Sequence, residues 1–264
     1  MSKWTLADQV GAEAAAKIEA ENAKAGPRTF IVPGDHLPPY MASVILQGTT
    51  LLFAIVMGIA ITFNIMTLQL LERIAAGGFA TQEEQVAALA PILRWVEMVG
   101  PVTIGTFVLC VIAYLNFVYA AARNLERAWA AGFKRTPWGA VGVSFIPLGN
   151  LVMIYQVMRD IWVSSHDPRH GALKPTPLLA AWWTLYLVGN VGTRILSRTL
   201  GGAGNDASAA ATYLWIETGL LAMVLASCLL LFKIVGDIRI AQSQWTDPAV
   251  DQTAEPASLA ADVA

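Results

Sequence analysis

Charge is scarce in this chain. Of its 264 residues only 14% are Asp, Glu, Lys or Arg, whereas 56% are hydrophobic. Soluble domains carry charge on about a quarter of their residues, so the composition favours a polytopic membrane protein over a soluble domain. The net charge is -2 and no block of Lys and Arg occurs. Neither nucleic acid nor a polybasic lipid-headgroup anchor is therefore expected.

The chain also contains only two cysteines. Cys110 and Cys228 both fall inside apolar segments, where a thiol behaves as a small hydrophobe, so we expect two inert buried thiols. A cleavable signal peptide is also missing. The first 30 residues contain four acidic side chains and no apolar stretch, so the first spanning segment is expected to serve as the insertion signal.

Long apolar runs, in contrast, are abundant. Crossing about 30 Å of hydrocarbon takes about 20 helical residues. Four runs meet this requirement and predict an all-α bundle with four spanning helices, over residues 42–71, 101–122, 177–197 and 212–235. The predicted organisation has three parts: a cytoplasmic helix and Pro-rich linker over residues 1–40, a transmembrane domain over 41–243, and a disordered acidic tail over 244–264.

A fifth apolar segment, residues 138–163, is interrupted by Pro147, Gly149 and Asn150. Non-helical backbone at membrane depth persists only where other protein or a water-filled cavity covers it. The residues before Pro147 rise only about 14 Å as a helix, which reaches mid-membrane without crossing. We therefore predict a re-entrant segment, with a kinked fifth span as the alternative.

The distribution of Lys and Arg separates these alternatives. Five spans would divide the basic residues ten against seven between the two sides of the membrane. Re-entry would instead place thirteen on the side of both termini and four on the other. Only the second division follows the positive-inside rule clearly, and it predicts that both termini are cytoplasmic.

The segment between the first two spans begins with a helix start signal. Thr81 and Glu84 have the spacing of a capping box, so a short helix should begin there. This helix is expected to lie in the membrane interface until Gly100 and Pro101 redirect the chain into the second span.

Six short motifs follow one another along the chain: Tyr119-Ala-Ala-Ala-Arg-Asn124, Pro137-Trp138, Phe145-Ile-Pro147-Leu-Gly-Asn150-Leu, Tyr155-Gln-Val-Met-Arg159-Asp-Ile-Trp162, Trp182-Trp183 and Gly189-Asn190. Through these motifs the sequence resembles, over about residues 42–243, a bacterial membrane family, the domain of unknown function 4328. Ile154 stands where that family commonly has a second Pro. The resemblance implies a multi-pass protein of the bacterial inner membrane and no established activity.

Polar and aromatic residues around the break make up the candidate binding site. Asn124 and Asn190 lie on polar stripes of two different spans, and both stripes are expected to face inward. The full candidate set is Asn124, Trp138, Pro147, Asn150, Tyr155, Gln156, Arg159, Trp162, Trp183 and Asn190. These residues could line a polar vestibule, or could form interhelical hydrogen bonds that only fix packing, which is the interpretation we favour.

Ionisable side chains give few further candidates. Glu217 is the one acid well inside an apolar run, and it is expected to form a structural ion pair with Arg194 or Arg198 near one membrane surface. Pro168 interrupts the helix that would align His166 with His170, so no metal site is predicted. Phosphate-binding loops, nucleophile elbows and paired catalytic carboxylates are missing, so we expect neither a cofactor nor an enzyme.

Two functions remain open. The first is a scaffold or interaction subunit that contacts a membrane protein partner or a second copy of the chain. The second is a small-molecule or lipid pocket at the tip of the broken segment near Asn150, because transporters place their sites at irregular backbone. Membrane lipids are expected partners in both cases. A pathway requires a polar cavity around Asn150, whereas a scaffold should be packed there.

Overall fold

The computed structural model describes residues 31, 38–146, 149–199 and 207–245, and the secondary structure of these residues is helical. No strand occurs among these residues, so the predicted all-α class is confirmed. The predicted N-terminal helix and nearly all of the predicted linker and tail lie outside the described residues.

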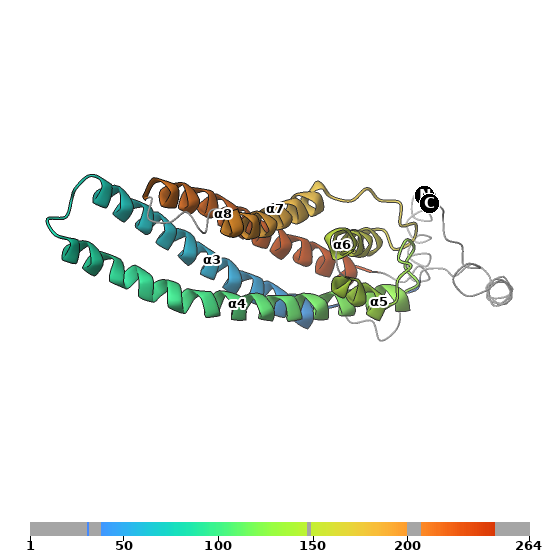
Figure 1. Ribbon diagram of the computed structural model, residues 1–264. Coiled ribbons are helices and arrows are strands. Elements are labelled where there is room, and N and C mark those ends of the chain that lie inside the picture. Colours follow the sequence, from blue (N-terminus) through green and yellow to red (C-terminus); the bar gives the residue numbers. More distant parts are fainter. Residues whose placement is uncertain (1–30, 32–37, 147–148, 200–206, 246–264) are drawn as a thin grey trace, which may run out of the picture.

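Four long helices form the bundle: α3 (Tyr40–Ala75), α4 (Gln82–Arg127), α7 (Pro177–Thr199) and α8 (Ala207–Ser243). The chain runs along the bundle in alternating directions (Figure 1), so that α3 begins, α4 ends, α7 begins and α8 ends at the same end. α8 packs against both α3 and α7, and α3 also packs against α4. α8 is therefore the shared element of the bundle.

Three of these helices are long and apolar enough to cross a membrane: Tyr40–Ala75, Gln82–Arg127 and Ala209–Ser243. They contain the predicted spans 42–71, 101–122 and 212–235. The fourth predicted span is present as helix α7, but α7 does not reach the same apolarity, since its window includes Asn190 and Arg194. Its crossing therefore stays a prediction.

α4 begins at the predicted capping signal. The side-chain oxygen of Thr81 accepts from the Glu84 N–H at 3.2 Å, and the Glu84 carboxylate accepts from the Ala80 N–H at 2.9 Å. The expected end of this helix at Gly100 and Pro101 is wrong. α4 continues through Pro91 and Pro101 as one 46-residue helix. Each proline removes one backbone hydrogen bond and bends the helix without ending it.

The interruption of residues 138–163 lies where the sequence predicts it. α5 (Pro137–Gly142) leads into a 3-10 turn, η1 (Val143–Phe145), and α6 (Asn150–His166) starts after the break. Ile146 has extended backbone, with φ -81° and ψ 115°, which ends the first half. α6 is seen nearly end-on in Figure 1, so it lies across the long helices rather than alongside them.

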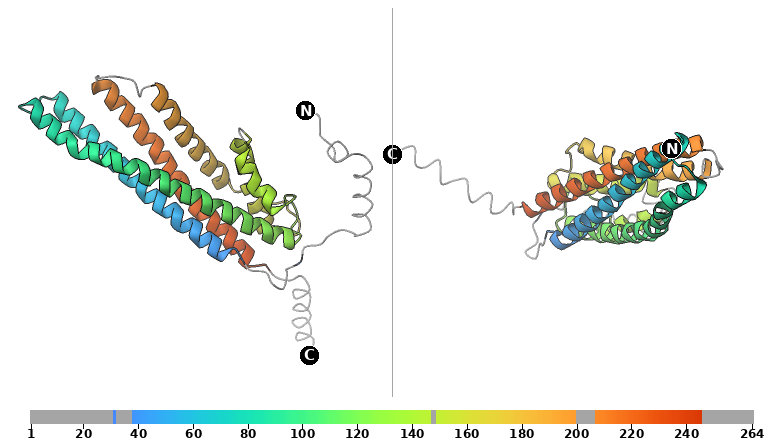
Figure 2. Two further views of the ribbon diagram at one scale, coloured as in Figure 1. Left: turned by 60° about the horizontal axis from the view of Figure 1, so that its bottom comes forward. Right: turned by 90° about the vertical axis from the view of Figure 1, so that its left-hand side faces the viewer.

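The main core is at the end of the bundle that holds α5 and α6 (Figure 2). Phe117, Leu125, Met158, Ile161 and Ile234 are all fully buried there. These side chains come from α4, α6 and α8, and together they fix α6 across the bundle.

α7 and α8 approach each other closely at two glycines. A Cβ on Gly189 would lie 2.6 Å from Cγ2 of Val224 and 3.0 Å from the Leu220 carbonyl oxygen. A Cβ on Gly192 would likewise lie 2.6 Å from Cδ2 of Leu220. Small residues of this kind let helix backbones approach in membrane proteins.

Candidate functional site

A cavity of about 230 Å³ lies inside the bundle. Its walls come from α3, α4, α7 and α8, and Ser144 of η1 and Ile154 of α6 close it on the side of the broken segment. We call it the central cavity. It lies next to the break, where the sequence predicts a pocket.

The central cavity is at the middle of an uncharged band. α8 carries no charged residue from Thr218 to Phe232, and Ser227 lies within this stretch. On α4, the cavity residue Cys110 is midway between Glu97 and Arg123, with no charge between them. The cavity is therefore far from the charged ends of both helices.

Aromatic rings form much of the cavity wall. Phe53 and Phe107 face each other with ring centroids 5.8 Å apart. The ring centroid of Trp183 lies 5.3 Å from that of Trp182, in a tilted pair, and 5.2 Å from that of Tyr186, in a stacked pair. Tyr114 also belongs to the aromatic lining, and none of the described residues that line the cavity is charged.

A few polar groups interrupt this apolar wall. Thr50, which is 1% exposed, lies with its hydroxyl 3.5 Å from the Cys110 sulfur. Ser227 is 2% exposed, and the structure shows no hydrogen bond to its hydroxyl from any described residue. The Tyr186 hydroxyl interacts electrostatically with Arg194, which is outside the cavity lining, and with Tyr114 and both cysteines. The polar side-chain groups of the described lining itself are hydroxyls, thiols and indole N–H groups.

Trp183 connects the cavity wall to the broken segment. Its indole N–H donates to the Leu151 carbonyl oxygen at 2.6 Å, just after the break. The carbonyl oxygens in the first turn of a helix already accept hydrogen bonds from N–H groups of the same helix. The bond from Trp183 is therefore an additional one, and it anchors the start of α6 to α7. Of the ten candidate site residues, Trp183 is the one that lines the central cavity within the described part of the chain.

Asn124 belongs to a different polar cluster, at the end of the bundle. Its side-chain amide donates to the Gln242 side-chain oxygen at 3.0 Å. Gln242, fully buried, donates to the Ser165 hydroxyl at 2.9 Å, and the Trp245 indole donates to the Ser165 carbonyl oxygen at 3.0 Å. The cluster joins α4, α6 and α8, which supports the interpretation of Asn124 as a packing residue.

The remaining described candidates do not gather at one place. Trp138 is exposed, and its ring contacts the ring of Tyr119. Arg159 forms an ion pair with the neighbouring Asp160 at 2.7 Å. The ring of Trp162 stacks on that of His166, with 4.0 Å between the ring centroids. Asn190 donates to the carbonyl oxygen of Tyr186, one turn earlier in its own helix.

Four of the candidate residues remain to be placed. Tyr155 and Gln156 are half-buried on α6. Pro147 and the side chain of Asn150 lie outside the described part of the structure. The polar vestibule therefore stays a prediction.

Glu217 has different partners from those predicted. Its carboxylate accepts from the Asn64 side-chain amide at 3.2 Å, and Tyr213 lies beside it. Among the described residues no ion pair joins Glu217 to Arg194 or Arg198. Both arginines are exposed, whereas Glu217 is half-buried toward α3.

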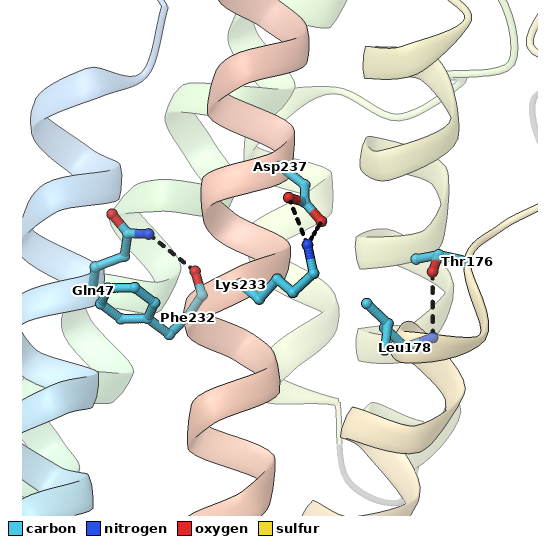
Figure 3. Close-up of polar contacts among 6 residues, drawn as sticks. All are labelled: Gln47, Thr176, Leu178, Phe232, Lys233 and Asp237. Carbon is cyan, nitrogen blue, oxygen red and sulfur yellow. Dashed lines mark hydrogen bonds and ion pairs between the residues drawn. The ribbon is translucent and has the colours of Figure 1, made fainter.

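One side-chain contact joins α3 to α8: the Gln47 side-chain amide donates to the Phe232 carbonyl oxygen at 3.0 Å (Figure 3). Next to it, Lys233 and Asp237 form an ion pair within α8 at 3.1 Å. No group of His, Cys, Asp and Glu side chains among the described residues could hold a metal ion.

Most of the cavity residues escaped the sequence analysis. Thr50, Ser144 and Ser227 lie in three different apolar segments, and they form no motif. The two cysteines were expected to be packing residues, and both contribute to the cavity wall. A hydroxyl residue on each of several spans was the available signal, but sequence alone does not show which helix faces meet.

The fold and the cavity define a class: an all-helical bundle with helices that could span a membrane and an uncharged cavity between them. The chain belongs to the family described as Domain of unknown function (DUF4328), whose model matches residues 80–235. This match covers α4 to most of α8. No curated protein and no solved structure matched the chain.

Proposed function

We propose that the chain is a multi-pass protein of the bacterial inner membrane with four spans, α3, α4, α7 and α8, and with both termini in the cytoplasm. The broken segment would re-enter from the cytoplasmic side. Support comes from the alternating directions of the four helices (Figure 1) and from the basic residues, thirteen against four under this topology.

α7 can serve as the fourth span despite its polar residues. Its 23 residues extend about 35 Å, enough to cross the hydrocarbon. The Asn190 side-chain amide is satisfied by the Tyr186 carbonyl oxygen. Arg194 and Arg198 lie in the last two turns, from which long side chains reach the membrane surface.

Reporter fusions test this topology. A reporter that is active only in the cytoplasm is fused to each terminus in turn, and to the loop between α3 and α4 as the control. Activity at both termini and none at the loop is the expected result. Opposite results at the two termini would mean that residues 138–163 cross the membrane.

For function, we propose that the protein binds a small molecule or lipid in the central cavity and carries out no chemistry on it. The observation that carries this proposal is the position of the cavity, in the middle of the uncharged band and directly beside the break in the broken segment. A bundle that serves only as a scaffold gains stability from filling such a space, because unfilled volume costs packing energy.

Native mass spectrometry of the full chain tests the binding proposal. Protein extracted from its own membranes in mild detergent is expected to retain a bound molecule. Ser227→Leu, which fills part of the cavity, should reduce the bound fraction, whereas Ser243→Leu at the exposed end of α8 should not. Wild-type protein that carries no bound molecule at any detergent concentration would contradict the proposal.

A scaffold or interaction subunit is the second candidate function. It is favoured by the exposed aromatic residues around α5, where Trp138 is 71% and Phe145 70% exposed. Exposed aromatic anchors are typical of interfaces with partners. Cross-linking in native membranes, followed by identification of protein partners, is the test. Loss of a specific cross-link in Trp138→Ala together with Phe145→Ala would support this role, and an unchanged pattern would contradict it.

A further inference from the structure

We propose that the ligand of the central cavity is a neutral molecule of one or two rings that carries a carbonyl or hydroxyl group, and that Ser227 hydrogen-bonds this group. The inference rests on the proposed binding function and specifies its ligand class. Four properties of the cavity support it: its volume, its lack of charge, its aromatic wall and the state of the Ser227 hydroxyl.

The volume limits the size of the ligand. A buried cavity of about 150 Å³ lined by apolar side chains is enough to bind benzene. The central cavity, at about 230 Å³, is larger by roughly half. This volume holds one or two rings, and most of a phospholipid would have to lie outside the cavity.

The lining excludes a charged ligand. The lining residues that the structure describes carry no charge, and on α8 the nearest charges along the helix are Glu217 and Lys233, at the two borders of the uncharged band. An ion without a counter-charge at this depth costs several kcal/mol or more. A neutral molecule avoids this cost.

The aromatic wall suits a ring. Phe53 and Phe107 from α3 and α4 line the cavity together with Trp182, Trp183 and Tyr186 from α7. Aromatic pairs gain energy from offset-stacked and edge-to-face arrangements beyond the burial of apolar area. A flat ring makes better use of these surfaces than a flexible alkyl chain does.

Ser227 lacks the backbone hydrogen bond that several other hydroxyl residues of the long helices make. A hydroxyl within a helix commonly donates to the carbonyl oxygen one turn earlier. In this structure such bonds are made by Thr62, Thr67, Thr106, Thr193 and Thr218 at 2.7–2.9 Å. Ser227 makes no such bond to any described residue, although it is 2% exposed and lines the cavity.

A buried hydroxyl without a partner is costly, more so in a membrane than near water. Tyr114 and Tyr186 add two further hydroxyls to the same wall, and no described residue is seen to hydrogen-bond either of them. A ligand with one carbonyl or hydroxyl group would satisfy Ser227 and can reach a tyrosine as well. The polar group of the ligand is therefore expected to face the α8 wall.

Thermal stabilisation of the detergent-solubilised full chain tests the ligand class with three probes. 1-Tetralone is a neutral two-ring ketone, tetralin is the same ring system without the oxygen, and phenyltrimethylammonium is a cation of similar size. The melting temperature is followed against probe concentration, because a ligand that binds only the folded state raises it. Probe partition into detergent is the same for every variant, so comparisons between variants isolate the cavity.

We expect 1-tetralone to stabilise the wild type at roughly threefold to tenfold lower concentration than tetralin, the range of one neutral hydrogen bond. Ser227→Ala should remove this advantage and leave tetralin unchanged, whereas Ser243→Ala should alter neither. Tyr114→Phe, which removes only a hydroxyl, is the second variant and should weaken 1-tetralone alone. Either cavity variant supplies the comparison if the other does not fold.

The outcomes separate the two proposals. If 1-tetralone and tetralin act equally in the wild type and both cavity variants, binding stands and the hydrogen-bonding ligand class is wrong. If the cation stabilises best, the neutral class is wrong. If no probe shifts the melting temperature, the proposed binding function fails together with the inference.

Discussion

The side-chain amide of Asn124 on α4 donates to the side-chain oxygen of Gln242 on α8 at 3.0 Å. Gln242 is fully buried and also donates to Ser165 on α6 at 2.9 Å. Two residues 118 positions apart thus join the second and the last long helix, and through Ser165 they hold the second half of the broken segment.

Replacement of Gln242 by leucine should destabilise the protein although it makes the core more apolar. The change leaves Asn124 and Ser165 each with one hydrogen-bond partner fewer in a buried site, which costs about 1–3 kcal/mol. Thermal unfolding in detergent measures the effect. Gln244→Leu is the matched control, because Gln244 is exposed on the same helix end. Equal melting temperatures for the two variants would contradict the role of the cluster.

Trp183→Phe tests the anchor between α7 and the start of α6. The variant keeps an aromatic ring in the cavity wall but loses the 2.6 Å bond to the Leu151 carbonyl oxygen. A stability loss of about 0.5–1.5 kcal/mol is expected, with faster hydrogen exchange in the first turn of α6. Trp215→Phe at an exposed position of α8 serves as the control. Unchanged exchange in α6 would show that the bond does not hold the break.

The partners of Glu217 lead to a different prediction from the ion pair. Asn64→Leu removes the donor at 3.2 Å and should cost about 0.6–1.7 kcal/mol, as polar contacts between membrane helices do. Glu217→Gln keeps an acceptor for Asn64 and should change stability little. Arg194→Ala and Arg198→Ala should be nearly neutral. A large loss for either arginine variant would restore the predicted ion pair.

Asp167, in the loop between α6 and α7, should make stability pH-dependent. Its partial burial raises the pKa, but the N–H groups of Ala172 and His170 and the His170 ring lower it by more, so the pKa of Asp167 is below its usual range. A lowered folded-state pKa gives stability that is present above the ordinary Asp pKa of about 4 and is lost as the pH falls through the folded value.

Asp167→Asn should therefore flatten the acid limb of a plot of melting temperature against pH. The exposed Glu126→Gln on α4 is the control and should leave the limb in place. An unchanged acid limb in Asp167→Asn would show that another carboxylate is responsible.

The sequence predicted the helices well because apolar length and capping chemistry are local properties. Thr81 caps α4 as its spacing to Glu84 indicates, and the broken segment is interrupted between η1 and α6. Pro101 was misjudged as a helix end. A proline removes a single hydrogen bond, and a helix with enough other contacts continues past it.

The candidate site could be predicted only in part, because it depends on which helix faces meet. Trp183 and the neighbourhood of the break were identified, whereas Ser227 was not. Glu217 was assigned to Arg194 or Arg198 from a shared height along the bundle. In the structure it faces Asn64 on α3 instead, because height along a helix does not specify the direction of a side chain around it.

Gly189 lies outside the lining of the central cavity, yet it determines how wide that cavity can be. The glycine lets α7 rest directly on the backbone of α8, while Trp183 and Tyr186 on α7 and Ser227 on α8 form opposing walls. One methyl group at Gly189 would act as a spacer that moves these walls apart. Under the proposed binding function, selectivity for ligand size would respond to a position outside the cavity lining, without any change in the cavity wall itself.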